Sequence, residues 1–293
     1  MGSFKAIATS LPLLLAVLLI ASLMTNDVSL WTLWSRFGDE EFYMVVAVVL
    51  YYFLPRPQQG LALVIAVLLS GSLNMALKYA FNLPRPPNPL VEVSGPSFPS
   101  GHAQVSSSFW SSLSLLAKKA IVTVISGLMI VGISLSRVSL RAHNPVDVVV
   151  GALIGCAVGC ASYLTLRHYT KRRSFAGYYV SAGVAVALST YNFMAFEADP
   201  GSSMALLGLS LAALTALPIL KSVEPVKSSI LFKGFVSAIS VALLSVVHTA
   251  TRGYVPYARL ACFYAAGLCL FLMSLASQAL LKRPWLSYVR ASG

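Results

Sequence analysis

Long apolar stretches recur along the whole chain and are interrupted only by short polar segments. A stretch of about 20 apolar residues is long enough for a helix to cross the hydrocarbon core of a bilayer. Of the 293 residues, 57% are hydrophobic and only 10% are charged, whereas a soluble domain carries about 25% charged residues. The sequence therefore predicts an all-α polytopic membrane protein and excludes a soluble domain of any size.

About ten transmembrane helices can be placed on this pattern. They are expected near residues 6–24, 41–55, 60–80, 101–117, 120–137, 145–166, 175–195, 203–220, 229–248 and 258–281. The first stretch follows Lys5 and has no convincing cleavage site, so we interpret it as a helix and not as a removed leader. An amphipathic piece at 29–36 precedes the second span, and we expect Trp31 and Trp34 to lie at the level of the lipid headgroups.

The distribution of charge gives this arrangement an orientation. Ten spans place fourteen of the 21 Lys and Arg residues on the face that holds both termini, and eight of the nine acidic residues on the other face. Cytoplasmic loops of membrane proteins are enriched in cations. We therefore expect cytoplasmic termini in a prokaryotic plasma membrane, or alternatively in the endoplasmic reticulum with the opposite face luminal. The net charge of +12 is explained in this way without a nucleic acid partner.

Small residues in the apolar stretches indicate packing and not chemistry. Gly151, Gly155 and Gly159 recur every four residues in the sixth span, and such a ridge lets a neighbouring helix approach closely. The cysteines lack nearby partners at metal-ligand spacing, so we interpret them as small packing residues: Cys156, Cys160, Cys262 and Cys269.

Three polar clusters interrupt the pattern, all on the predicted extracytoplasmic face. The first runs from Lys78 to Arg85-Pro86 at the end of the third span. The second is Pro99-Ser100-Gly101-His102 at the start of the fourth, and the third runs from Ser136-Arg137 to Asp147 between the fifth and sixth spans. Ionisable residues at the membrane edge are costly, so several on one face point to a functional site.

The cationic members of these clusters suit a phosphate group. Lys78, Arg85 and Arg137 supply positive charge, and the arginine fork binds tetrahedral oxyanions in a bidentate manner. Ser100 is a predicted N-cap, and Gly101 in the first turn lets the backbone approach an anion closely. The amides at such a helix N-terminus form a phosphate site.

Two histidines supply the remaining chemistry. Asn144 and Pro145 predict the start of a helix, which places Asp147 in the first turn, where its carboxylate can reach back to His143. A carboxylate on one ring nitrogen leaves the other nitrogen free to attack phosphorus. His102 has no such acidic partner in the neighbouring sequence and is expected to protonate a leaving oxygen.

These clusters match the three signature motifs of the type 2 phosphatidic acid phosphatase (PAP2) superfamily: K-x6-R-P, P-S-G-H and S-R-x5-H-x3-D. The resemblance implies that His143 is a nucleophile forming phosphohistidine, that Asp147 orients it and that His102 is the general acid. It implies phosphate binding by Lys78, Arg85, Ser100, Gly101 and Arg137. It also implies a six-helix catalytic core, which we place at residues 1–167. Because polar residues become scarce after residue 167, we expect a C-terminal extension of four helices at 168–293.

Two features of this chain differ from the smallest relatives. One is the C-terminal extension, which those relatives lack, and the other is Arg141. Arg141 stands two residues before His143, where relatives often carry glycine. It either adds charge for a diphosphate or second acidic group at the rim of the site, or faces lipid headgroups. Four residues near the end of the ninth span could also rim the pocket, but we interpret them as interfacial anchors: His248, Arg252, Tyr254 and Tyr257.

The resemblance implies a metal-independent phosphatase that hydrolyses a lipid phosphate or diphosphate taken from the bilayer. Substrate classes are phosphatidic acid, phosphatidylglycerophosphate, a prenyl diphosphate or a sphingoid phosphate. No carboxylate cluster for Mg²⁺ is visible and no cofactor is expected. The alternatives are a phosphotransferase on the same scaffold, a glucose-6-phosphatase-like enzyme for a soluble ester, and a lipid-binding or transport protein.

Overall fold

The computed structural model describes residues 2–196, 199–220 and 229–281, which form eleven helices and no strand. This confirms the predicted all-α class. The helices are α1 (Gly2–Thr25), α2 (Val28–Arg36), α3 (Glu40–Phe53), α4 (Pro57–Phe81), α5 (Gly101–Ala117), α6 (Ala120–Ser139), α7 (Pro145–Arg172), α8 (Ala176–Ala195), α9 (Pro200–Leu220), α10 (Ile230–Ala250) and α11 (Pro256–Leu281).

Six helices in the described part of the chain are long and apolar enough to cross a membrane. They are Pro57–Phe81, Ala120–Ser139, Pro145–Arg172, Pro200–Leu220, Ile230–Ala250 and Pro256–Met273, and Ser10–Thr25 is a shorter apolar helix. The protein is therefore described as an integral membrane protein, and the count of ten spans stays a prediction. Each of the ten predicted spans nevertheless coincides with a helix. The remaining helix, α2, is the amphipathic piece expected at 29–36.

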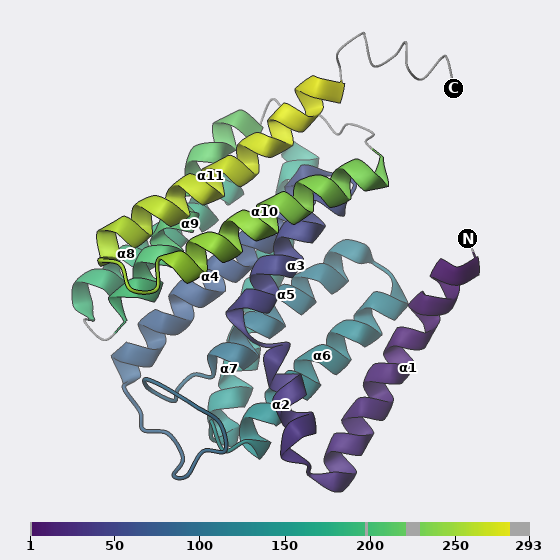
Figure 1. The fold of residues 1–293 in the computed structure, drawn as a ribbon, viewed down its shortest axis with the longest axis vertical. Coiled ribbons are helices and arrows are strands. Elements are labelled where there is room, and N and C mark those ends of the chain that lie inside the picture. The colour runs from purple at the N-terminus through teal and green to yellow at the C-terminus, as the bar shows by residue number, and fades with distance from the viewer. Residues whose placement is uncertain (1, 197–198, 221–228, 282–293) are drawn as a thin grey trace.

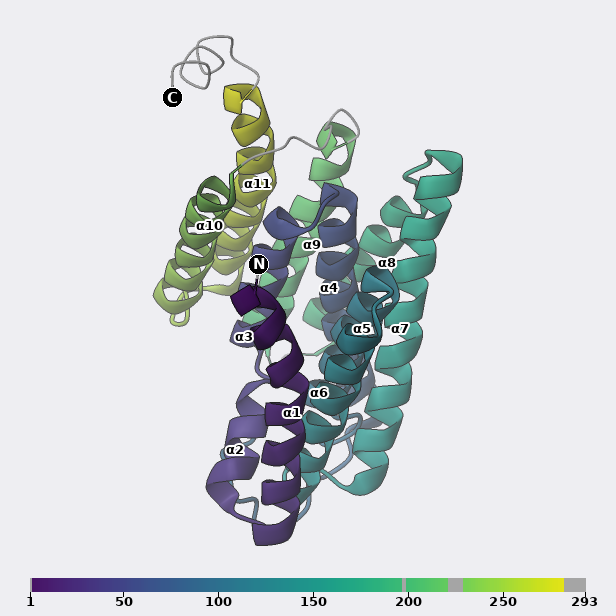
Figure 2. The same cartoon turned by 90° about the vertical axis from the view of Figure 1, so that its right-hand side faces the viewer.

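The helices form one bundle in which α4 and α5 occupy the centre (Figure 1). α5 packs along α7 and also contacts α4 and α6, while α1 and α2 cover α6. Figure 2, turned by 90°, shows α1 and α2 beside α6, with α10 and α11 on the far side of α3. The chain turns from α4 to α5 and from α6 to α7 at one end of this bundle, which we call the loop end.

The ridge of small residues on α7 is the seam between α7 and α5. A Cβ atom added to Gly151 would lie 2.7 Å from the carbonyl oxygen of Ser100, and one added to Gly155 would lie 2.1 Å from that of Gln104. Because both distances are shorter than real Cβ contacts, only glycine allows the two backbones to approach this closely. The predicted packing role of the ridge is confirmed. The cysteines are free and range from half-buried to exposed.

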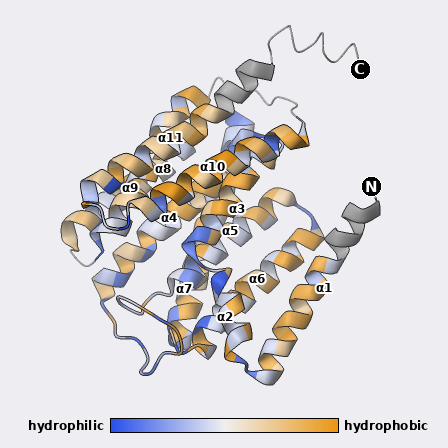
Figure 3. Ribbon diagram, viewed as in Figure 1, coloured by the Kyte–Doolittle hydropathy of each residue, from blue (hydrophilic) through white to orange (hydrophobic). Residues whose placement is uncertain are grey.

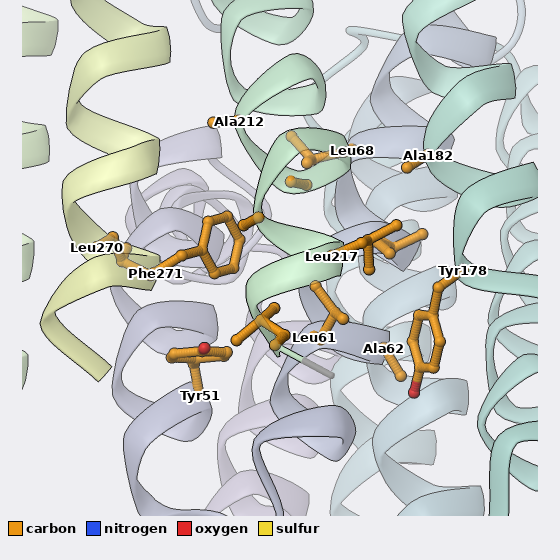
Figure 4. Packing of buried hydrophobic residues seen from close by; sticks show 14 of the residues in the cluster. Tyr51, Leu61, Ala62, Leu68, Tyr178, Ala182, Ala212, Leu217, Leu270 and Phe271 are labelled. Carbon is orange, nitrogen blue, oxygen red and sulfur yellow. The ribbon is translucent and has the colours of Figure 1, made fainter. Parts of the chain in front are cut away.

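The C-terminal helices pack directly on the core. Tyr51 of α3 and Leu61 of α4 share one buried cluster with Tyr178 of α8, Leu217 of α9 and Phe271 of α11 (Figure 4). α7 continues without a break through residue 167 and ends at Arg172, and α8 begins at Ala176. Apolar burial across this junction therefore holds α8–α11 against the helices that precede them.

The two tryptophans of the amphipathic piece are buried inside the protein, and their depth in the membrane stays a prediction. Trp31 and Trp34, predicted to lie at the headgroup level, are 2% and 0% exposed and belong to a buried cluster with Tyr43 and Ile133. Trp34 lies against Gly132 of α6, where an added Cβ would be 2.4 Å from the indole ring. α2 therefore packs its aromatic face against α6, and this contact anchors residues 35–39, which lead from α2 into α3.

Polar residues gather at the loop end, whereas the helices beyond it are predominantly apolar (Figure 3). The loop between α4 and α5 and the first turns of α3 and α7 meet there. Several residues used for the orientation lie outside the described residues: Lys221, Glu224, Lys227, Lys282, Arg283 and Arg290. The orientation in the membrane thus stays a prediction.

Candidate active site

The structure brings all three polar clusters together at the loop end. Lys78 lies in the last turn of α4, His102 in the first turn of α5, Arg137 in the last turn of α6, and His143 just before α7. Consecutive antiparallel helices return to the same end of the bundle, so residues far apart in sequence become neighbours here.

The arginine of the first motif is the centre of this arrangement. Arg85 donates through Nη1 to the carbonyl of Ala142 at 2.9 Å and lies 3.2 Å from Nε2 of His143. Its other nitrogens donate to the carbonyls of Gly95 at 2.9 Å and Ser94 at 2.7 Å. One guanidinium therefore joins the α4–α5 loop to the turn that carries His143.

These contacts determine which nitrogen of His143 can react. A guanidinium can only donate hydrogen bonds, so Nε2 beside Arg85 is the unprotonated nitrogen, and its lone pair faces the guanidinium. The proton then resides on Nδ1, which lies 3.3 Å from Oγ of Ser97 and 3.7 Å from a carboxylate oxygen of Asp147. This is the tautomer that a nucleophilic imidazole requires.

The predicted pairing of His143 with Asp147 is modified by a hydroxyl. Ser97 donates a hydrogen bond to Oδ2 of Asp147 and faces Nδ1 of His143, so its hydroxyl links the two. Asp147 also accepts from the backbone amide of Asn144 at 2.9 Å in the expected capping arrangement. The sequence analysis did not identify Ser97 as a site residue, because no helical spacing relates it to His143 or Asp147.

His143 is held neutral by its surroundings. Its side chain is almost fully buried, and burial, followed by the positive charges of Lys78, Arg85 and Arg137, lowers the pKa of His143 to about 2. Burial also lowers the pKa of Arg85, though the charge of Asp147 opposes this effect. Because a neutral imidazole keeps its lone pair, the ring stays available for attack at physiological pH.

The lysine and glycine of the motifs meet at the start of α5. Nζ of Lys78 donates to the carbonyl of Pro96 at 2.7 Å. A Cβ on Gly101 would lie 2.9 Å from Oδ1 of Asn74 and 3.8 Å from Cε of Lys78. Glycine therefore leaves room for the side chain of Asn74 beside the N-terminus of α5, close to Lys78.

Two buried polar atoms at this site have no hydrogen-bond partner among the described residues. Oγ of Ser100 is fully buried and, although Ser100 is the N-cap of α5, its side chain does not cap the helix. Nε of Arg137 is likewise unpaired, while Nη1 of the same residue donates to Ser35. Buried polar groups are normally paired, so a hydroxyl and a guanidinium N–H left in this state suit an oxyanion ligand.

His102 does have an acidic partner, which corrects the expectation drawn from its neighbours in sequence. Its Nε2 lies 3.0 Å from Oδ1 of Asp39, a residue 63 positions away at the start of α3. In the sequence, this pairing is indicated only by the acidic run at 39–41, which lies on the same predicted extracytoplasmic face as His102.

The remaining candidates lie at the periphery. Arg141 is exposed and has a φ angle of 54°, in the left-handed region that favours glycine. His248 and Arg252 lie 3.5 Å and 3.6 Å from a carboxylate oxygen of Glu41. Tyr254 and Tyr257 are more than half exposed, as suits interfacial anchors.

The described residues contain no group of three or more His, Cys, Asp or Glu side chains that could hold a metal ion.

A family model described as PAP2 superfamily matches residues 59–171. This stretch contains all three motifs and confirms the resemblance drawn from them. No curated protein and no solved structure matches the chain.

Proposed function

We propose that this membrane protein, whose residues 59–171 belong to the PAP2 superfamily, is a phosphatase that hydrolyses a lipid phosphate or diphosphate through a phosphohistidine. The observation that carries the proposal is the contact between Arg85 and Nε2 of His143 at 3.2 Å. It presents a lone pair next to a guanidinium, and phosphoryl transfer needs both a nucleophile and positive charge at one point.

In the first step Nε2 of His143 attacks phosphorus, and the bond from phosphorus to the leaving oxygen breaks. Arg85, Arg137 and Lys78 stabilise the charge on the equatorial oxygens, together with the amides that begin α5. His102 gives its proton to the leaving oxygen, which departs as an alcohol or, from a diphosphate, as a phosphate monoester. A positioned general acid of this kind contributes about 10²–10⁴ in rate.

In the second step water attacks the phosphohistidine. His102 is now neutral and accepts a proton from the attacking water, while the bond between Nε2 and phosphorus breaks. Inorganic phosphate leaves, and both histidines return to their starting protonation states. The chain formed by Ser97 and Asp147 holds the proton on Nδ1 of His143 throughout.

An amphiphilic substrate is supported by a cleft beside the site, which we call the α4–α8 cleft. It has a volume of about 850 Å³ and lies between the ends of α4 and α8, with Tyr79, Leu83, Gly95, Pro96 and Phe196 among its lining residues. The carbonyls of Gly95 and Pro96 are the ones that accept from Arg85 and Lys78. A hydrocarbon chain in this mainly apolar cleft would thus begin next to the phosphate group.

We further propose that residues 1–167 are the catalytic core and 168–293 an extension, with the site on the extracytoplasmic side and the termini in the cytoplasm. The α4–α8 cleft gives the extension a role, since Phe196 of its lining follows α8.

The test is phosphate release from the purified protein in detergent, across the four lipid classes and a soluble ester, with EDTA present. His143→Ala should abolish release, whereas His168→Ala, at the far end of α7, should retain it. Orthovanadate should inhibit, because it mimics five-coordinate phosphorus. A strict Mg²⁺ requirement, or a His143→Ala variant as active as the parent, would overturn the proposal. Turnover only with an added acceptor would instead indicate a phosphotransferase.

A further inference from the structure

The acidic partner of His102 comes from a segment outside the three motifs and outside the matched stretch 59–171. This segment, residues 35–39, ends α2 and leads into α3; we call it the α2–α3 turn. It contacts two residues of the candidate site, since Ser35 accepts a hydrogen bond from Arg137 and Asp39 pairs with His102.

The carboxylate of Asp39 is directed at His102 in preference to its own helix. Asp39 is the N-cap residue of α3, and aspartate in this position usually accepts hydrogen bonds from amides of the first turn. Its side chain makes no such capping bond. Instead Oδ1 lies 3.0 Å from Nε2 of His102, and the two side chains are 42% and 27% exposed.

The backbone around Asp39 is shaped for this contact. A Cβ on Gly38 would lie 2.7 Å from the ring carbon Cδ2 of His102 and 2.8 Å from Cγ2 of Ile133. Only glycine therefore lets the turn approach the imidazole this closely. Trp34, packed against Gly132, anchors the turn from the other side.

We propose that Asp39 is a positioning residue that orients His102 and stabilises its protonated form; this inference rests on the proposed phosphatase function. The charged or titratable groups around His102 are Asp39 of the turn, Lys78 of α4, Arg137 of α6 and His143 before α7. Burial and the two cations oppose protonation of the ring, whereas the carboxylate of Asp39 favours it.

With Nε2–H donating to Asp39, protonated His102 holds its second proton on Nδ1 and gives that proton to the leaving oxygen. The ring is then neutral and still bound to Asp39. In the second step Nδ1 takes a proton from the attacking water, which restores the starting state. Asp39 exchanges no proton in either step.

The test compares Asp39→Asn and Asp39→Glu with the matched control Glu41→Gln. Glu41 lies two residues further on and pairs with His248 and Arg252, away from His102. We expect Asp39→Asn to lower kcat about 10–100-fold with little change in KM, which is less than the loss of a whole general acid. Asp39→Glu should recover part of this activity, and Glu41→Gln should behave like the parent.

Two further readouts separate positioning of the general acid from a purely structural role. An aryl phosphate with a good leaving group needs little protonation, so the loss of kcat/KM in Asp39→Asn should be several-fold smaller for it than for an alkyl phosphate. The basic limb of the pH profile should move to lower pH, because the carboxylate no longer stabilises the imidazolium. In a His102→Ala background, Asp39→Asn should have no additional effect.

Equal losses of kcat/KM on both substrates with an unshifted pH profile, or an Asp39→Asn variant as active as the parent, would overturn the inference. Either result leaves the proposed function intact, since the parent protein is active in both cases. A parent protein that releases phosphate from none of the substrates would instead contradict the proposed function.

Discussion

The backbone amide of Ser100 donates a hydrogen bond to the backbone carbonyl of Asp147 at 3.0 Å. This bond fastens the first turn of α5, which carries His102, to the first turn of α7, whose aspartate supports His143. The two histidines are thereby held by one rigid contact between helices. The close approach of α5 and α7 depends on the glycine ridge of α7, so stability and catalysis are coupled at this seam.

The seam gives the first prediction. Gly151→Ala places a methyl group 2.7 Å from the carbonyl of Ser100, and overpacking of this kind costs about 1–3 kcal/mol. We expect a lower thermal unfolding midpoint in detergent and a lower kcat, because Ser100 and its helix must shift. Gly127→Ala in α6 is the matched control, since an added Cβ there meets nothing within 4 Å. Equal midpoints for the two variants would contradict this account of the seam.

The hydroxyl between His143 and Asp147 gives the second prediction. Ser97→Ala removes the link that keeps the proton on Nδ1, so kcat should fall about tenfold, the effect of losing a hydrogen bond worth roughly 1.5 kcal/mol. Ser97→Thr should retain more activity because it keeps the hydroxyl. Ser114→Ala, at the opposite end of α5, serves as the control. If Ser97→Ala were fully active, the link would have no catalytic role.

The fork of Arg85 gives the third prediction. Lysine keeps the charge, but a single ammonium group cannot donate hydrogen bonds to the carbonyls of Ser94, Gly95 and Ala142 and also face the imidazole beside them. Arg85→Lys should lower kcat/KM at least about 100-fold, since hydrogen bonds of charged groups are worth roughly 1.5–3 kcal/mol each. Arg167→Lys, on the exposed far end of α7, should be unchanged. A loss below tenfold would show that charge alone suffices at position 85.

The lowered pKa of His143 gives the fourth prediction. With a pKa of about 2, this imidazole is neutral throughout the range from pH 5 to 8, and only much stronger acid would protonate it. Between pH 5 and 8, kcat/KM corrected for ionisation of the substrate should therefore have no acidic limb due to the nucleophile. An ordinary histidine would instead lose activity below pH 6.5. A corrected acidic limb near pH 6.5 that persists in Lys78→Met would contradict the prediction.

The α4–α8 cleft gives the fifth prediction. Leu83 is 45% exposed and lines the cleft beside the stacked rings of Tyr79 and Phe196. Leu83→Trp should fill part of it and lower kcat/KM for a long-chain lipid phosphate about tenfold, the equivalent of roughly two buried methylene groups. A short-chain ester should be unaffected. Leu90→Trp, on the same loop and similarly exposed, is the control, and equal effects on both chain lengths would exclude a chain-binding role.

Much of the local structure could be predicted from the sequence. Apolar length and cap residues predicted α5 at 101–117 and the start of α7 at Pro145. The motif spacing indicated which polar residues belong together, and the glycine ridge indicated a close helix contact. These features depend on residues near one another in the chain, where periodicity and capping follow from backbone geometry.

The contacts between residues that are distant in sequence were decided by the tertiary structure. The pairing of Asp39 with His102 and the insertion of Ser97 before Asp147 join residues 63 and 50 positions apart, and no local spacing encodes either. The burial of Trp34 could not be predicted because an apolar helix face is equally suited to lipid and to another helix. Local sequence thus determined the helices and the reactive groups, whereas only packing decided which partner each reactive group meets.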